Sequence, residues 1–272
     1  ASSDTRPLMS SNASNNTTFV YAISNNGTTF NSYLNGTNDF SGSSGTFGVQ
    51  NPPTIGFSTG GGAEAHFVGD IAEVAIYSAA LPLVEIVVIE NYLSSRYGLT
   101  LSTNDKFSEG DGTYDNDVIG IGRLSGSIHA ISQAGGLYFD DNSGLDNSDE
   151  WLFGAHDGTT TSVVQTDLPS GVADRWARVW YLDKSATLGA NVKVGFDFSD
   201  SGLGGSPSST KIYLLLYRAG TSGAFTALTT PAFTISGDQV IFEVSDANLT
   251  DGYFTLGLED LTVFTDASVA AG

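Results

Sequence analysis

The sequence contains no cysteine, only 10 basic residues against 30 acidic ones, and no long apolar run. Without cysteine, disulfide bonds and thiolate metal sites are excluded. The formal net charge of −20 disfavours binding to duplex nucleic acid or to an anionic membrane. No segment approaches the roughly 18 consecutive apolar residues of a membrane-spanning helix, so no membrane span is expected.

Common catalytic and zinc-binding patterns are also scarce. The three histidines do not have the spacing of metal ligands, and no H-E-x-x-H segment occurs. The E-x-D-x-x-E arrangement of acids that concanavalin-type glycoside hydrolases carry on one strand is missing. Gly120 and Gly122 precede no expected helix and therefore suit close packing within a strand better than a phosphate loop. We expect a protein that is not an enzyme.

Residues 67–99 contain the most informative pattern, which is a strand followed by one amphipathic helix. Within Asp70–Tyr77, apolar residues are interspersed with small and polar ones, as expected of a packed strand. Pro82 then stands where a first helical turn can begin, apolar residues recur at helical spacing, and Gly98 suits a C-cap. The sequence predicts a strand, a turn and a helix in that order.

These residues carry a resemblance to a known family. Gly69–Tyr77 reads GDIAEVAIY and Ile89–Gly98 reads IENYLSSRYG, and in this order the two blocks resemble the C-terminal end of laminin-G-like, concanavalin-type jelly rolls of microbial surface proteins. The segment Tyr33–Gly36, YLNG, resembles a hairpin of the same family. The resemblance implies a partial jelly roll over residues 1–98, with one C-terminal helix, in a secreted or cell-surface protein.

Residues 99–272 have a different composition, with 23 of the 30 acids and 8 of the 10 bases. Many short strand signals separated by Gly, Asp, Asn and Ser predict an antiparallel β-sandwich with a C-terminal tail. Asn116–Arg123, Arg175–Trp180 and Gly252–Gly257 resemble blocks of a β-sandwich that follows laminin-G-like domains in large bacterial surface proteins. The expected fold is therefore all-β: a jelly-roll module over residues 1–98, then a sandwich over 99–272.

Two acidic stretches are candidate calcium sites. Closely spaced carboxylate and amide oxygens on turning loops are the ligands that Ca²⁺ prefers. The predicted ligands are Asp140, Asp141, Asn142, Asp146 and Asp149 in the first stretch, and Asp111, Asp115 and Asp117 in the second. A solvated hairpin loop and a hydrated linker are the respective alternatives. Ca²⁺ is the expected cofactor.

The three tryptophans allow two interpretations. Trp176 and Trp180 are four residues apart, which places them on one face of a continuous strand, with Arg178 between them. A stacked Trp–Arg–Trp surface could bind a sugar. Burial in the core of the sandwich is the more common arrangement and is favoured here.

The position of the terminal helix has a consequence for function. A full laminin-G-like domain has roughly 150 to 200 residues, an ordinary domain size, so a helix that ends near Gly98 implies missing strands. The sequence could be a fragment, the strands could have been cleaved, or a neighbouring subunit could supply them by strand addition. We therefore expect a non-enzymatic, extracellular structural or adhesive protein that self-associates into a filament or layer and is stiffened by calcium. The alternative is a calcium-dependent, lectin-like carbohydrate-binding module of a larger secreted protein, with a glycan or cell-surface ligand.

Overall fold

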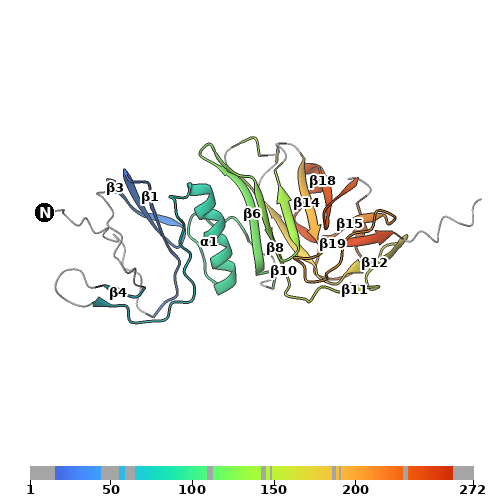
Figure 1. The fold of residues 1–272 in the computed structure, drawn as a ribbon, viewed down its shortest axis with the longest axis horizontal. Coiled ribbons are helices and arrows are strands. Elements are labelled where there is room, and N and C mark those ends of the chain that lie inside the picture. Colours follow the sequence, from blue (N-terminus) through green and yellow to red (C-terminus); the bar gives the residue numbers. More distant parts are fainter. Residues whose placement is uncertain are drawn as a thin grey trace, which may run out of the picture. The chain divides into compact units, whose positions relative to one another are not determined.

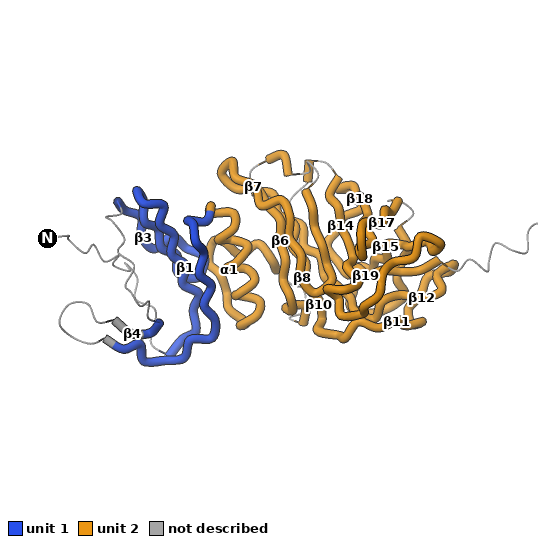
Figure 2. Tube along the Cα trace, viewed as in Figure 1, with its two compact units in different colours: residues 1–81 blue, residues 82–272 orange. Residues whose placement is uncertain are grey.

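The computed structural model describes residues 16–43, 55–58, 65–108, 113–141, 145–147, 149–185, 188–189, 191–228 and 232–259. The chain forms two compact units, residues 1–81 and residues 82–272 (Figure 2). Among the described residues, strands predominate, and the strands pair in antiparallel fashion. The all-β prediction is confirmed.

Unit 1 contains a three-stranded meander of β1 (Tyr21–Asn25), β2 (Thr29–Leu34) and β3 (Thr37–Ser43). Its first turn is stabilised by Asn26, whose side-chain oxygen accepts hydrogen bonds from the backbone N–H groups of Thr28 and Thr29. The second turn places Asn35 and Gly36 at φ values of 48° and 80°, as a tight hairpin requires. A further short hairpin pairs β4 (Phe57–Ser58) with β5 (Ala65–His66).

The strand predicted at Asp70–Tyr77 does not form. Residues 67–81 belong to no strand, and in Figure 1 they are a plain trace between β5 and the helix. The N–H group of Phe67 still donates to the carbonyl of Gly56, at 2.8 Å, and among the described residues the ladder of this hairpin does not continue beyond it. Apolar spacing describes which side chains a strand would bury, whereas a strand also needs a partner for its backbone.

The single described helix, α1 (Leu83–Tyr97), confirms the predicted limits. Pro82 precedes it as the N-cap, where its missing N–H is tolerated. Gly98 ends it with φ of 61°, and the N–H groups of Gly98 and Leu99 donate to the carbonyls of Ser95 and Ser94. Within the described part of the chain, no helix is long and apolar enough to cross a membrane.

Unit 2 is a sandwich of two antiparallel sheets (Figure 1). The larger sheet has the order β11-β12-β19-β13-β10-β6-β7, and β15 pairs with both β19 and β16. Its strands are β6 (Asn116–Leu124), β7 (Ser127–His129), β10 (Glu150–His156), β11 (Val163–Val164), β12 (Val172–Trp176), β13 (Trp180–Lys184), β15 (Tyr213–Arg218), β16 (Thr226–Ala227) and β19 (Gly252–Glu259).

The smaller sheet has the order β17-β18-β14-β9-β8. Its strands are β8 (Ile131–Ala134), β9 (Leu137–Asp140), β14 (Val192–Asp197), β17 (Phe233–Ser236) and β18 (Gln239–Val244), and a 3-10 turn, η1 (Asp246–Asn248), precedes β19. The predicted sandwich of short strands is therefore present.

The strand signal that the sequence shows over Arg175–Leu182 is divided into β12 and β13. Both strands pair with the same side of β19, one after the other along it. Between them, the buried Thr255 hydroxyl lies 3.0 Å and 2.9 Å from the carbonyl oxygens of Trp176 and Arg178. A side-chain donor thus replaces the backbone ladder at this break.

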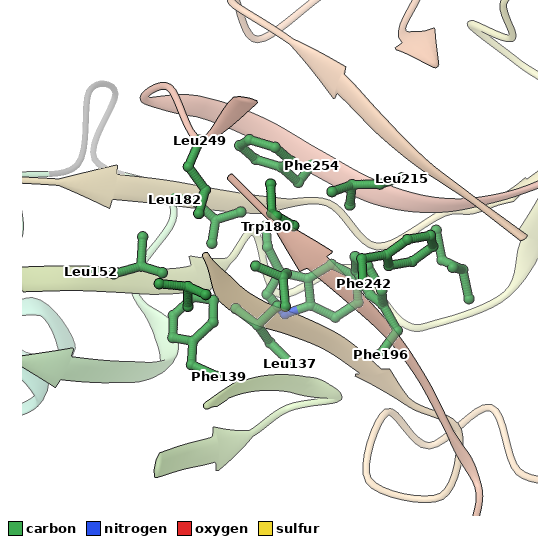
Figure 3. Packing of buried hydrophobic residues seen from close by; sticks show 14 of the residues in the cluster. Leu137, Phe139, Leu152, Trp180, Leu182, Phe196, Leu215, Phe242, Leu249 and Phe254 are labelled. Carbon is green, nitrogen blue, oxygen red and sulfur yellow. The ribbon is translucent and has the colours of Figure 1, made fainter. Parts of the chain in front are cut away.

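The core between the two sheets is aromatic and aliphatic (Figure 3). Trp180 and Phe196 meet edge to face with ring centroids 5.3 Å apart, and both are fully buried. Burying one such side chain stabilises the fold by about 1.5–3 kcal/mol. Trp151 and Trp176 are buried as well, which confirms the core interpretation of the tryptophans. The Trp–Arg–Trp surface does not form, because the Arg178 guanidinium donates to the carbonyls of Thr159 and Gly135 instead.

The helix belongs to unit 2 and covers the other face of the large sheet. Val84 and Val87 pack with Trp151 and Phe153 of β10 and with Val118 of β6. The compact units consequently divide before the helix, whereas the sequence places the boundary between modules after it, at residues 98 and 99. The placement of the domain boundary after the helix stays a prediction.

Candidate functional site

The described acids of the first predicted calcium loop contact other residues of the chain. Asn142 lies outside the described residues, and each of the four predicted acids has a backbone or side-chain contact of its own. Asp140 forms an ion pair with Lys193, and the Asp141 carboxylate accepts a hydrogen bond from the N–H of Leu145. The backbone carbonyl of Asp146 accepts from Arg123. Asp149 forms an ion pair with Lys106 and accepts a hydrogen bond from the indole N–H of Trp151. Burial alone would raise the pKa of Asp149, but hydrogen bonds from Lys106 and Trp151 outweigh it and lower the pKa.

The described acids of the second predicted loop also contact other residues. Asp111 lies outside the described residues, Asp115 accepts from the Asn116 side chain at 2.9 Å, and Asp117 contacts His156. Within the described ranges, no three His, Asp or Glu side chains come together in a way that could hold a metal ion. Because Asn142 and Asp111 lie outside the described residues, calcium binding at these loops stays a prediction.

The buried His156 pairs with the exposed Asp117, a contact that the sequence does not reveal. The N–H of Gly158 donates to His156 Nδ1 at 2.9 Å, so the ring proton resides on Nε2 and is donated to Asp117 Oδ2 at 3.0 Å. Burial lowers the pKa of His156, which keeps the ring neutral, although the hydrogen bond to Asp117 opposes this shift. Both ring nitrogens are engaged, so the pair orients the loop after β10 and has no nitrogen left to act as a base.

One G-x-S-x-G pentapeptide does occur, at Gly56-Phe57-Ser58-Thr59-Gly60. A nucleophile elbow needs a sharp strand-to-helix turn that exposes the serine. Ser58 instead lies in β4, opposite Ala65 of β5, and the described helix begins only at Leu83. The described surroundings of this motif are those of a hairpin.

A pocket of about 110 Å³ opens at the β12, β15 and β19 side of the sandwich. Trp176, Phe198 and Tyr213 line it, together with apolar side chains and with Asp174 and Lys211. Each of the three aromatic side chains is more than nine-tenths buried. The pocket therefore offers little ring surface on which a sugar could stack.

Asn91 holds the segment after the helix and was missed by the sequence interpretation. Its side-chain N–H₂ donates to the carbonyls of Val87 and Asn104, and its oxygen accepts from the N–H groups of Lys106 and Phe107. Asn91 is fully buried. Residues 104–107 are thus fixed to the helix. One feature of the sequence could have indicated this role: Asn91 places an amide one helical turn after Val87, among the apolar positions of the helix.

Asp183 of β13 fixes the next residue of the same segment. Its carboxylate accepts from the Ser108 N–H at 2.7 Å and lies 3.3 Å from the Ser108 hydroxyl. Burial raises the pKa of Asp183 to about 6, the Ser108 N–H opposes the shift, and the negative charges of Asp251 and Asp105 add to it. No sequence pattern distinguishes this carboxyl from the exposed ones.

Residues 67–77, here called the open segment, are the strongest candidate for an interaction site. Of the 12 large apolar side chains that are exposed among the described residues, six lie in these 11 positions: Phe67, Val68, Ile71, Val74, Ile76 and Tyr77. Ile76 is 81% exposed and Val68 is 95% exposed. Exposed apolar, strand-forming residues gathered in one short segment are typical of a surface that pairs with another chain.

Comparisons with known proteins agree with the unit 1 assignment. Residues 3–87 match the Laminin_G_3 family model, described as the concanavalin A-like lectin/glucanases superfamily. Comparison with curated proteins and comparison with solved structures each give no match. The family match ends inside α1 and covers less than half of the chain. Over residues 3–87 the chain is therefore similar to a laminin-G-like jelly-roll module, which supports a lectin-like or structural role.

Proposed function

We propose that this is a non-enzymatic structural or adhesive protein of the cell surface, which self-associates through the open segment. A laminin-G-like module completed by a neighbouring subunit would assemble into a filament or layer. The similarity over residues 3–87 supports the lectin-like or structural class and, because laminin-G-like domains are typically extracellular, a location outside the cell.

The observation that carries this proposal is the contrast between the open segment and the rest of the chain. Unit 2 buries its large aromatic side chains and pairs its strands in two sheets. The open segment has side chains of the same kind, including Ile71, Val74 and Ile76, but leaves them in solvent. Pairing with another chain would remove this exposed apolar area from water.

Self-association of the purified chain tests the proposal. We expect the wild-type protein to form assemblies larger than a monomer in light scattering and electron microscopy, and Ile76→Asp to be monomeric. The matched control is Ile212→Asp, which adds the same charge at an isoleucine that is exposed but outside any strand. A wild-type monomer, or an Ile76→Asp variant that assembles like the control, would contradict the proposal.

A calcium-dependent carbohydrate-binding module is the second candidate, favoured by the lectin/glucanases description of the matching family. Binding of the wild-type chain to a glycan array, with and without a chelator, separates the two functions. Glycan binding that is lost on chelation, by a monomeric protein, supports the second candidate. Assemblies that dissociate on chelation would instead support a calcium-stiffened polymer. Release of sugars from polysaccharides would show that the protein is an enzyme and exclude both.

A further inference from the structure

The open segment has the features of an acceptor for one added strand. The β4–β5 hairpin sets its direction, since the last ladder bond joins Phe67 to Gly56. The 11 residues that follow, 67–77, bend at Gly69, contain no proline and carry exposed apolar side chains at both odd and even positions. An added strand would extend the hairpin and cover these side chains in one step.

The chain contains a segment whose sequence fits this acceptor. Residues 261–271 read LTVFTDASVAA and have the same length as the open segment. On one face of a strand they would present Leu261, Val263, Ala267, Val269 and Ala271, with Thr265 the only interruption. They contain no proline and no glycine, and Leu261–Thr265 is rich in residues that favour strands.

The place where this segment starts argues for a second copy of the chain. The last residues of β19 lie between Val172 of β12 and Tyr213 of β15, inside the large sheet of unit 2. Asp260 is the only residue between Glu259 and the candidate donor. One residue spans at most about 3.6 Å, so pairing within one chain needs the open segment to lie directly at the end of β19. Pairing between copies needs no such placement.

We propose that residues 261–271 of one copy add as a strand to residues 67–77 of a second copy. This inference rests on the proposed self-association and names its two surfaces. Donor and acceptor are different parts of the chain, so each copy has one of each and the contact repeats from head to tail. Such a heterologous contact gives an open filament unless the rotation between copies closes a ring.

Complementation between two full-length variants tests the inference. Val263→Pro combined with Val269→Pro removes two donor N–H groups and interrupts the strand, which leaves only the acceptor functional. Ile76→Asp leaves only the donor functional. We expect each variant alone to be monomeric and an equimolar mixture to form a heterodimer in size-exclusion chromatography with light scattering. The matched control, Val263→Thr with Val269→Thr, keeps β-branched residues and should assemble like the wild type.

A synthetic peptide of residues 260–272 provides a measurement that does not depend on folding of the variants. It should bind the open segment, shorten wild-type assemblies and bind the donor-defective variant. The Val263→Pro peptide should bind more than about tenfold more weakly, because proline cannot complete the ladder.

The outcomes separate the inference from the proposed function. If the donor-defective variant still assembles while Ile76→Asp does not, self-association stands and the C-terminal donor is wrong. If Ile76→Asp assembles as well, both are wrong. If the wild type is a monomer that does not bind the peptide, and the donor-defective variant is a monomer that does, the tail pairs within its own chain and the inference is overturned.

Discussion

At the scale of single residues, buried polar side chains determine how the segment after α1 is held. Asn91 uses all of its hydrogen-bonding capacity on four backbone groups, two of them on Lys106 and Phe107. A buried polar group that is fully satisfied specifies one arrangement, because each alternative leaves an unpaired donor or acceptor. Asp183 holds Ser108 in the same way, because its carboxylate accepts a hydrogen bond from the Ser108 N–H.

Asp183 should make the stability of the protein depend on pH. Its pKa is raised from 3.8 to about 6 in the folded state, so the folded protein binds its proton more tightly than the unfolded chain does. Stability should therefore fall as the pH rises from about 4 to about 6 and stay level above that, by as much as about 3 kcal/mol for this group. Asp183→Asn should remove this decrease, since an amide oxygen can still accept from Ser108.

Urea unfolding at several pH values between about 4.5 and 7.5 measures this effect. The lowered pKa values of Asp197 and Asp246 act in the opposite direction and mainly below the unfolded value of 3.8. The lowered pKa of His156 and the raised pKa of Asp105 also act within this window, so the contribution of Asp183 is measured as the difference between the wild type and Asp183→Asn. Asp146→Asn, at an exposed carboxylate, is the control. A variant whose pH dependence equals that of the wild type would show that Asp183 is not the titrating group.

At the scale of elements, two glycines on β6 leave space for two aromatic rings of the neighbouring strand β10. Gly122 lies opposite Trp151 and Gly120 lies opposite Phe153 across the β6–β10 ladder. A Cβ atom on Gly122 would approach the Trp151 ring far within contact distance, and a Cβ on Gly120 would meet Phe153 in the same way. The expectation that these glycines serve close packing is confirmed, because each aromatic ring covers the space that a side chain would take.

Gly122→Ala should therefore destabilise unit 2. Overpacking of a buried site costs about 1–3 kcal/mol and requires Trp151 to move. The free energy of unfolding in urea measures the loss, and tryptophan fluorescence of the folded variant reports the displaced ring. Gly220→Ala is the matched control, because a Cβ at this position meets no atom within 4 Å. A Gly122→Ala variant as stable as this control would mean that the sheet accommodates the methyl group without strain.

Elements also show where sequence patterns fail. The helix limits were predictable because Pro82 and Gly98 mark them by local backbone chemistry. The strand at Asp70–Tyr77 was not, because pairing depends on a partner that the pattern does not contain. The division of Arg175–Leu182 depends on Thr255, which is distant in the sequence.

At the scale of the whole molecule, a net charge of −20 opposes contact between copies. The open segment contains Asp70 and Glu73, and the proposed donor contains Asp266. Salt should therefore promote assembly by screening this repulsion, over a Debye length that falls from about 30 Å at 0.01 M to about 10 Å at 0.1 M. The mean mass in light scattering should rise with NaCl concentration, whereas Ile76→Asp should stay monomeric throughout. Assemblies that dissolve as salt is added would indicate that opposite charges hold the copies together.

The sequence by itself determined the all-β class, the limits of the helix, most strands of the sandwich and the similarity of unit 1 to a laminin-G-like module. These properties follow from local periodicity, turn residues and family-specific blocks, all of which lie close together in the chain. Only the tertiary structure decided that the tryptophans are buried, that α1 packs on unit 2, that Asn91 and Asp183 fix the following segment, and that residues 67–77 form no strand. Each of these depends on contacts between residues distant in sequence, which no local pattern records.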